Sequence, residues 1–140
     1  MRALALDVGS KTIGLAVTDG AGIAAHALKV HRREGTQKDA MSILDIIKEY
    51  EVTSVVVGLP YTLSGDVGHR AKRVRVFSDA LKEVCEPSVR FFEWDERFST
   101  SAVEKILIKS NVSREKRKKI IDSSAAVYIL QGWMESRTSE

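Results

Sequence analysis

Three short apolar stretches open this chain, and helical and extended patterns alternate only after residue 36. The stretches cover residues 3–8, 13–18 and about 24–31, and polar or glycine-bearing turns separate them. Runs of this length between turn residues are typical of strands and too brief for helices. The chain is therefore expected to begin with three antiparallel strands that form a meander.

The pattern after residue 36 favours crossover connections. Thr36 is expected to cap a helix that ends near residue 50, and Val52–Leu59 contains a β-branched run typical of a strand buried on both faces. A second helix with apolar residues from Ala71 to Val84 leads to a fifth strand, Val89–Trp94. The sequence thus predicts helices that connect parallel strands.

Two further helices are expected near the end of the chain. In the first, Ser101 and Glu104 fit a capping box, and the second begins near Ser113 and runs to about Glu135. The predicted fold class is α/β, with a mixed five-stranded sheet in which three antiparallel strands precede βαβ crossovers, flanked by helices. This order matches the ribonuclease H-like architecture, and order alone also fits half of an actin-like ATPase.

Composition limits the class of protein. The 140 residues, 44% hydrophobic and 29% charged, predict one globular domain over residues 1–140. No apolar run approaches the ~18 residues of a membrane span, and Asp7 comes too early for a signal-peptide core. Cys85 is the only cysteine, which excludes an internal disulfide and argues against a Cys/His zinc site. We expect a cytoplasmic protein without a membrane partner.

Asp7 is the first candidate catalytic residue. It ends an apolar strand at a position where a core residue would otherwise continue the pattern. Because burial of an unpaired carboxylate is costly, the site must supply a partner, solvent or a metal ion. Gly9 and Gly14 flank the next turn and allow a close approach to the backbone. The alternative is that Asp7 caps its own turn.

Asp95 and Glu96 are the second candidates, since they end the predicted fifth strand. If the first and fifth strands are parallel, their carboxyl ends share one edge of the sheet, where such sheets bind ligands. Strand side chains alternate, so only one of the two acids can point toward Asp7, and Glu96, with the longer side chain, is favoured. Alternatively, Asp95 is a turn residue and Glu96 pairs with Arg97.

Asp122 is the third candidate. On the predicted last helix it shares a face with Ala125, Ala126, Ile129 and Trp133. An ionised carboxylate in an apolar stripe is costly unless a cation faces it. The small alanines would let this helix lie close to the sheet and bring Asp122 near the strand ends. The alternative is a salt bridge to a nearby lysine or arginine.

Acids from three elements that converge would suit Mg²⁺ or Mn²⁺, which prefer oxygen ligands. Two such ions ~4 Å apart can hold the attacking water and the leaving oxygen of a phosphodiester. We therefore predict that Asp7, Asp122 and one or both of Asp95 and Glu96 are catalytic and bind metal. The three histidines show no catalytic arrangement.

Two basic clusters predict a polyanionic partner. Four of the six residues 70–75 and five of the six residues 114–119 are basic, although the net charge is only +3. The alternative for either cluster is a solvated helix face. The residues expected to contact nucleic acid are Lys11, Arg70, Lys72, Arg73, Arg97, Lys116, Lys118 and Lys119.

Four motifs in this chain resemble those of the YqgF (RuvX) family, which is described as resolvase-like pre-16S rRNA nucleases. The first is residues 7–19, DVGSKTIGLAVTD, and the second is residues 57–60, VGLP, with Gly65. The third is residues 95–97, DER, with Ser99 and Thr100; the fourth is residues 122–126, DSSAA, with residues 129–131. They appear in the family's order and span nearly the whole chain.

The resemblance implies a ribonuclease H-like fold and a metal-dependent nuclease, endonucleolytic or exonucleolytic, that acts on the 5′ end of pre-16S rRNA. It implies that Asp7, Asp95 or Glu96, and Asp122 are the catalytic acids. Two positions depart from the pattern. Thr12 stands where the family often has arginine, and Gly58 stands where related Holliday-junction resolvases carry glutamate.

Other functions remain open from the sequence. A Holliday-junction resolvase and an inactive nucleic-acid-binding module are the main alternatives, whereas 140 residues cannot hold both halves of an actin-like ATPase. The expected partner is structured RNA or branched DNA, and the expected oligomeric state is a monomer or a weak homodimer.

Overall fold

The computed structural model describes residues 2–60, 68–95 and 113–138, without the side chains of residues 114–124 and 138. The strands are β1 (Arg2–Val8), β2 (Thr12–Thr18), β3 (Ala25–Arg32), β4 (Val52–Leu59) and β5 (Arg90–Asp95). The helices are α1 (Thr36–Glu49), α2 (His69–Val84) and α4 (Arg114–Thr138). These bounds agree with the sequence-based expectation to within a few residues at each end.

The described strands form a five-stranded sheet in the order β3-β2-β1-β4-β5. β1 and β2 are antiparallel, as are β2 and β3, whereas β4 runs parallel to both β1 and β5. The predicted meander followed by crossovers is therefore confirmed, as is the parallel orientation of the first and fifth strands. The carboxyl ends of β1, β4 and β5 meet at one edge of the sheet.

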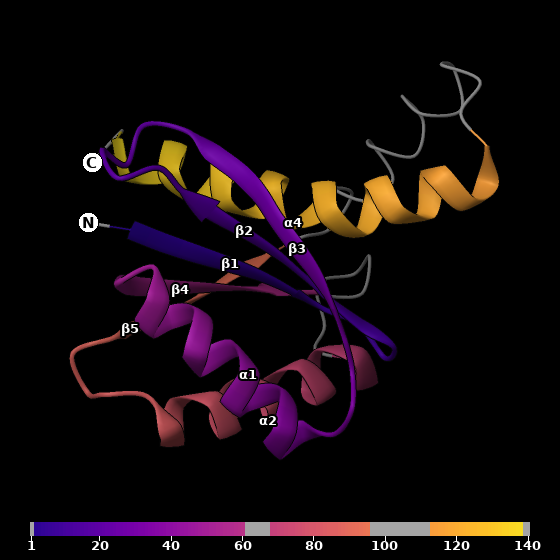
Figure 1. Ribbon diagram of the computed structural model, residues 1–140, viewed down its shortest axis with the longest axis horizontal. Helices are drawn as coiled ribbons and strands as arrows, with labels where there is room; N and C mark the ends of the chain where they lie inside the picture. Colours follow the sequence, from indigo (N-terminus) through magenta and orange to yellow (C-terminus); the bar gives the residue numbers. More distant parts are fainter. Residues whose placement is uncertain (1, 61–67, 96–112, 139–140) are drawn as a thin grey trace.

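Helices cover both faces of this sheet (Figure 1): α4 lies along one face, and α1 and α2 pack against the other. Alternation along each strand divides the core accordingly. Leu4, Leu6 and Val8 of β1 pack with α1 and α2, while Ala3 and Ala5 pack with α4. The small residues on the α4 side let that helix approach the sheet closely, as the alanines of α4 itself predicted.

The first turn of α1 differs from the expectation. Gly35, with φ 144°, is the N-cap, and Thr36 is the first helical residue and makes no capping hydrogen bond. The prediction that Thr36 caps this helix is therefore wrong. Asp39 instead holds the segment that leads into the helix, since its carboxylate accepts hydrogen bonds from the backbone N–H groups of Glu34 at 2.9 Å and Gly35 at 3.4 Å.

Some expectations lie outside the described residues. These are the loop after Pro60, the helix with Ser101 and Glu104, and the residues Gly65, Glu96, Arg97, Ser99 and Thr100. The last helix begins directly after Ser113, as expected. Within residues 2–60, 68–95 and 113–138, no helix is long and apolar enough to cross a membrane.

Candidate functional site: the carboxyl edge of the sheet

Asp7 lies near the carboxyl end of β1, the middle strand of the sheet. Asp7 pairs with Gly14 of the neighbouring strand β2. On the β4 side, Leu6 pairs with Val57, so Gly58 is the β4 residue next to Asp7 in the register. Side-chain alternation puts Asp7 on the same face as Ala3 and Ala5, beneath α4. Asp7 is only partly buried, so its carboxylate can meet solvent and ligands at the sheet edge.

Asp95 lies at the same edge but on the opposite face. It pairs with Leu59, whose side chain belongs to the core beneath α1 and α2. Phe91 and Glu93, four and two residues before Asp95 on the same strand, also face the α1 and α2 side. There Glu93 accepts a hydrogen bond from Arg75 of α2 at 2.9 Å. The structure therefore does not bring Asp95 and Asp7 onto one face. Glu96 lies outside the described residues.

Asp122 belongs to α4, which begins at Arg114. Three residues later, Ala125 and Ala126 are fully buried, and Ala126 and Ile129 pack on the face of the sheet that carries Asp7. The helix thus crosses the correct face, although the Asp122 side chain itself is not described. The side chains of Lys116, Lys118 and Lys119 are likewise not described, and Arg97 lies outside the described residues.

The packing that holds α4 beside β5 is tight. Trp94, the residue before Asp95, packs against Gly132 of α4, and a Cβ atom added at Gly132 would lie 2.9 Å from the indole ring. Trp133 also contacts Phe92 of β5, with ring centroids 5.2 Å apart. These contacts fix the distance between the end of β5 and the helix that carries Asp122.

The described residues contain no group of three His, Cys, Asp or Glu side chains that could hold a metal ion. Two of the four predicted ligands, Glu96 and Asp122, fall outside the part of the chain for which side chains are given. Asp7 fits a metal site by its chemistry and position: a carboxylate at the carboxyl edge, beside glycines that leave room for a ligand.

A basic cleft adjoins Asp7 across the sheet edge. It has a volume of about 310 Å³ and continues into a wider hollow along the β1–β2 turn that includes Lys11 and Arg32. The residues that line the cleft are Val8, Gly9, Ser10, Arg33, Arg70 and Arg73. Of the predicted nucleic-acid contacts, Lys11, Arg70 and Arg73 thus lie together, while Lys72 is exposed on α2 and lines neither cavity.

Asp39 organises this cleft, and the sequence interpretation missed it together with Arg33. Its side chain is fully buried, and Nε of Arg33 and Nε2 of His31 each lie 3.0 Å from its oxygens. Burial raises the pKa of Asp39, but hydrogen bonds from Glu34, His31, Arg33 and Gly35 outweigh it and lower the pKa to about 2. Asp39 is therefore ionised at neutral pH.

The sequence did contain a signal for Asp39. It lies one helical turn before Ile43 and two before Ile46, in line with the apolar stripe of α1. The same kind of signal identified Asp122 as a candidate, since it is also an acidic residue on the apolar face of a helix. The basic run His31-Arg32-Arg33 just before the helix supplies its partners.

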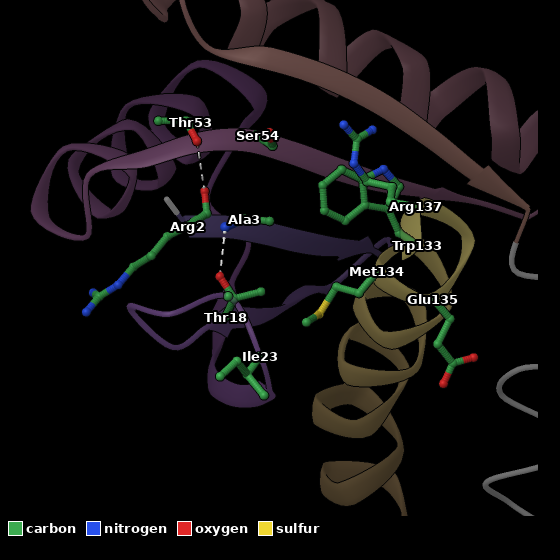
Figure 2. Close-up of a pocket in the computed structure, with 11 residues that line it drawn as sticks. Arg2, Ala3, Thr18, Ile23, Thr53, Ser54, Trp133, Met134, Glu135 and Arg137 are labelled. Atoms are coloured by element: carbon green, nitrogen blue, oxygen red, sulfur yellow. Dashed lines mark hydrogen bonds between the residues drawn. The ribbon is translucent and has the colours of Figure 1, made fainter. Parts of the chain in front are cut away.

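A separate pocket of about 500 Å³ lies at the opposite end of the sheet (Figure 2). It is formed by the start of β1, the end of β2 and the last turns of α4, with Trp133 and Met134 among its apolar residues. Thr18 Oγ1 accepts a hydrogen bond from Ala3 N–H at 2.9 Å beside it. None of the predicted site residues lines this pocket.

Comparisons of sequence show the family. The profile of the RuvX family, described as "Holliday junction resolvase", matches residues 1–136. A protein of Desulforamulus reducens named "Putative pre-16S rRNA nuclease" is 46% identical over 97% of this chain and 98% of its own length. A protein of the same name from Clostridium tetani is 43% identical over 97% of both chains.

Comparisons of structure show the fold. The RuvC protein of T. thermophilus, solved with a Holliday junction substrate, superposes with a TM-score of 0.64 at 13% identity over 99% of this chain and 96% of that chain. The Fowlpox virus resolvase, solved with Holliday junction DNA, superposes with a TM-score of 0.63 at 13% identity, over 97% of this chain and 98% of that chain. The fold is thus that of the RuvC resolvases, as the ribonuclease H-like expectation required, and the chain belongs to the RuvX family.

Proposed function

We propose that this protein is a metal-dependent nuclease that hydrolyses phosphodiester bonds at the 5′ end of pre-16S rRNA in the cytoplasm. The observation that carries the proposal is the position of Asp7: a carboxylate at the carboxyl edge of the middle strand, beneath α4, next to a cleft lined by three arginines. The names of the full-length relatives, at 43–46% identity, support the substrate.

Asp7, Glu96 and Asp122 are the proposed metal-binding acids. Asp7 and α4 share one face of the sheet, whereas the register of β5 puts Asp95 on the other, which favours Glu96 over Asp95. Mg²⁺ or Mn²⁺, in a pair of ions, would neutralise charge on the scissile phosphate and lower the pKa of the attacking water. The three carboxylates would hold the ions and orient that water.

The proposed nucleic-acid contacts divide between two elements. Lys11, Arg70 and Arg73 lie at the basic cleft and its hollow, and Lys72 is exposed beside them on α2. Lys118 and Lys119 come about one turn before Asp122 on α4 and Lys116 comes nearly two turns before it, and Arg97 follows Glu96 directly. Together they would hold a phosphate backbone near the acids. We propose that one domain over residues 1–140, as a monomer or a weak homodimer, carries out the reaction.

A cleavage assay with two substrates tests this proposal. The wild-type protein is incubated with an RNA that contains the 5′ leader of 16S rRNA and, separately, with a four-way DNA junction, each with Mg²⁺, with Mn²⁺ and with EDTA. We expect cleavage of the RNA with either metal and none with EDTA. Cleavage of the junction alone would support the resolvase activity suggested by the structural neighbours, and cleavage of neither would support an inactive binding module.

A further inference from the structure

We propose that Arg33, Arg70 and Arg73 form a binding site for one internal phosphate of the substrate strand. Asp39 is the positioning residue that holds Arg33 in this site. The site lies on the α1 and α2 side of the sheet edge, whereas Asp7 lies on the α4 side. The identity of the phosphate as part of a nucleic-acid substrate rests on the proposed function.

Arg33 is held on three sides. Its Nε donates to Asp39 Oδ2 at 3.0 Å, its Nη1 donates to the carbonyl oxygen of Gly9 at 3.0 Å, and its guanidinium lies 5.3 Å from the ring centroid of Phe77. An arginine has five N–H donors, and these two bonds use two of them. Among the described residues no further hydrogen bond occupies the other three donors, so they can bind an anion in the cleft that Arg33 lines.

The fixed position of Arg33 favours anion binding. A flexible surface arginine loses side-chain entropy when it binds a ligand, whereas a side chain that is already held in place loses little. Asp39 serves this purpose because its buried carboxylate accepts from His31 and two backbone N–H groups as well as from Arg33. With its pKa near 2, Asp39 keeps the charge that holds the guanidinium.

The charge of the cleft also fits a phosphate. Among the described residues, none of those that line the cleft is acidic, and none of the carboxylates forms an ion pair with Arg70 or Arg73. Arg75, on the same helix, instead forms an ion pair with Glu93 at 2.9 Å. The arginines of α2 thus divide into two that face the cleft and one that pairs with a strand.

The position of the cleft explains how it would serve the acids. Gly9 lines the cleft and lies two residues beyond Asp7, roughly 7 Å along an extended chain. A strand that passes over this edge could therefore place one phosphate at Asp7 and a nearby phosphate among the three arginines. The second contact would fix which bond of the strand lies at the acids.

Inorganic phosphate in EDTA tests the site without metal or cleavage. The probe is titrated at constant ionic strength while NMR follows the arginine Nε–H signals. We expect Arg33, Arg70 and Arg73 to shift with one common Kd and Arg75 to stay unchanged. Arg73→Ala should raise the Kd at least tenfold, and the matched control Arg75→Ala should leave it within twofold. Parallel shifts at Arg75, or equal effects of the two variants, would overturn the proposal.

The positioning role has its own readout. Asp39→Asn should weaken phosphate binding about tenfold and broaden the Arg33 signal. If that variant does not fold, Arg33→Lys replaces it, because lysine keeps the charge but cannot bond both Asp39 and Gly9 in the same planar geometry. Arg33→Lys should weaken binding at least fivefold. Wild-type affinity in Arg33→Lys would show that only charge matters and would overturn the positioning role.

Two RNAs of one sequence, with a 5′-phosphate or a 5′-hydroxyl, identify the source of the phosphate. Measured in EDTA, both should bind equally, and both should lose about tenfold in affinity with Arg73→Ala but not with Arg75→Ala. A preference for the 5′-phosphate that Arg73→Ala abolishes would overturn the internal assignment. If the wild type cleaves RNA but phosphate leaves the three arginines unchanged, the cleft proposal fails alone; if phosphate binds there but no nucleic acid is cleaved, the proposed function fails alone.

Discussion

The carboxylate of Asp39 lies 3.0 Å from Nε of Arg33, and the same guanidinium donates to the carbonyl oxygen of Gly9 in the turn after β1. This relationship links the start of α1 to the turn that follows Asp7. This ion pair joins a fully buried acid to a largely buried base, so removing one residue takes an ionic partner from the other, which destabilises the folded protein. The turn beside the candidate acids is therefore held by the core of the protein.

Asp39 should make the protein sensitive to acid. Its pKa falls from 3.8 to about 2 in the folded state, so it contributes stability above about pH 4 and loses it as the pH falls toward 2. The contribution is on the order of 2 kcal/mol at neutral pH. Chemical unfolding of Asp39→Asn between pH 2 and pH 7 should show a lower stability at pH 7 and a flatter dependence below pH 4.

The matched control for this measurement is Asp45→Asn, since Asp45 is an exposed acid on the same helix. Its unfolding curve should follow the wild type at every pH. An Asp39→Asn protein as stable as Asp45→Asn at pH 7 would contradict the role given to the buried network.

Glu96→Gln should damage cleavage far more than Asp95→Asn. The reason is the register of β5, which pairs Asp95 with Leu59 on the face away from Asp7. We expect Glu96→Gln to lower kcat by at least a hundredfold and Asp95→Asn by less than tenfold, with RNA binding in EDTA unchanged in both. The reverse order of damage would exchange the roles of the two acids.

The cluster on α4 should carry part of the salt dependence of binding. With about four phosphate contacts, the log-log slope of affinity against salt on duplex is about −3 to −4. Replacing Lys116, Lys118 and Lys119 with alanine should flatten that slope by about 2. The control is a triple alanine variant of Lys48, Lys82 and Arg90, three exposed residues at the end of α1, near the end of α2 and at the start of β5. It should keep the wild-type slope. Equal slopes in both triples would make the α4 cluster a solvated helix face.

Gly132→Ala should lower both stability and activity. A new Cβ would lie 2.9 Å from the Trp94 ring, so the helix or the strand must shift, at a cost of about 1–3 kcal/mol, which exceeds the helix propensity gained. Because Trp94 precedes the candidate acids and α4 carries Asp122, the same shift should lower kcat. Tm and cleavage rate are measured together; a raised Tm with full activity would contradict the tight packing described here.

The sequence predicted the fold closely because each element had its own local signal. The β-branched run of β4 and the short apolar runs of β1 and β2 each favour a strand, and short connections then leave few topologies. The cap of α1 was predicted wrongly because a threonine at the right place is a good cap in general. Only the tertiary structure reveals that Gly35 is the N-cap and that Asp39 bonds the N–H groups of Glu34 and Gly35, which precede the helix.

The candidate site was only partly predictable. Asp7, Arg70 and Arg73 were chosen for their unusual position or local charge, and the structure places them around one edge of the sheet. Arg33 was missed because its function depends on a partner six residues away in the sequence and on Gly9, 24 residues away. The sequence already favoured Glu96 over Asp95; the register of β5 adds that Asp95 lies on the face away from Asp7, and the role of Glu96 stays a prediction.

Cleavage of the 16S leader RNA by Asp7→Asn tests whether Asp7 is a catalytic metal ligand, and Asp79→Asn, a change at an exposed acid on α2, is the control. Asp7→Asn should keep the fold and bind RNA in EDTA like the wild type, because it removes a metal ligand and not a basic contact. Its Tm without metal should equal or exceed that of the wild type, since one source of carboxylate repulsion is gone. We expect Asp7→Asn to abolish Mg²⁺-dependent cleavage and Asp79→Asn to cleave normally. Full activity in Asp7→Asn would contradict this role of Asp7.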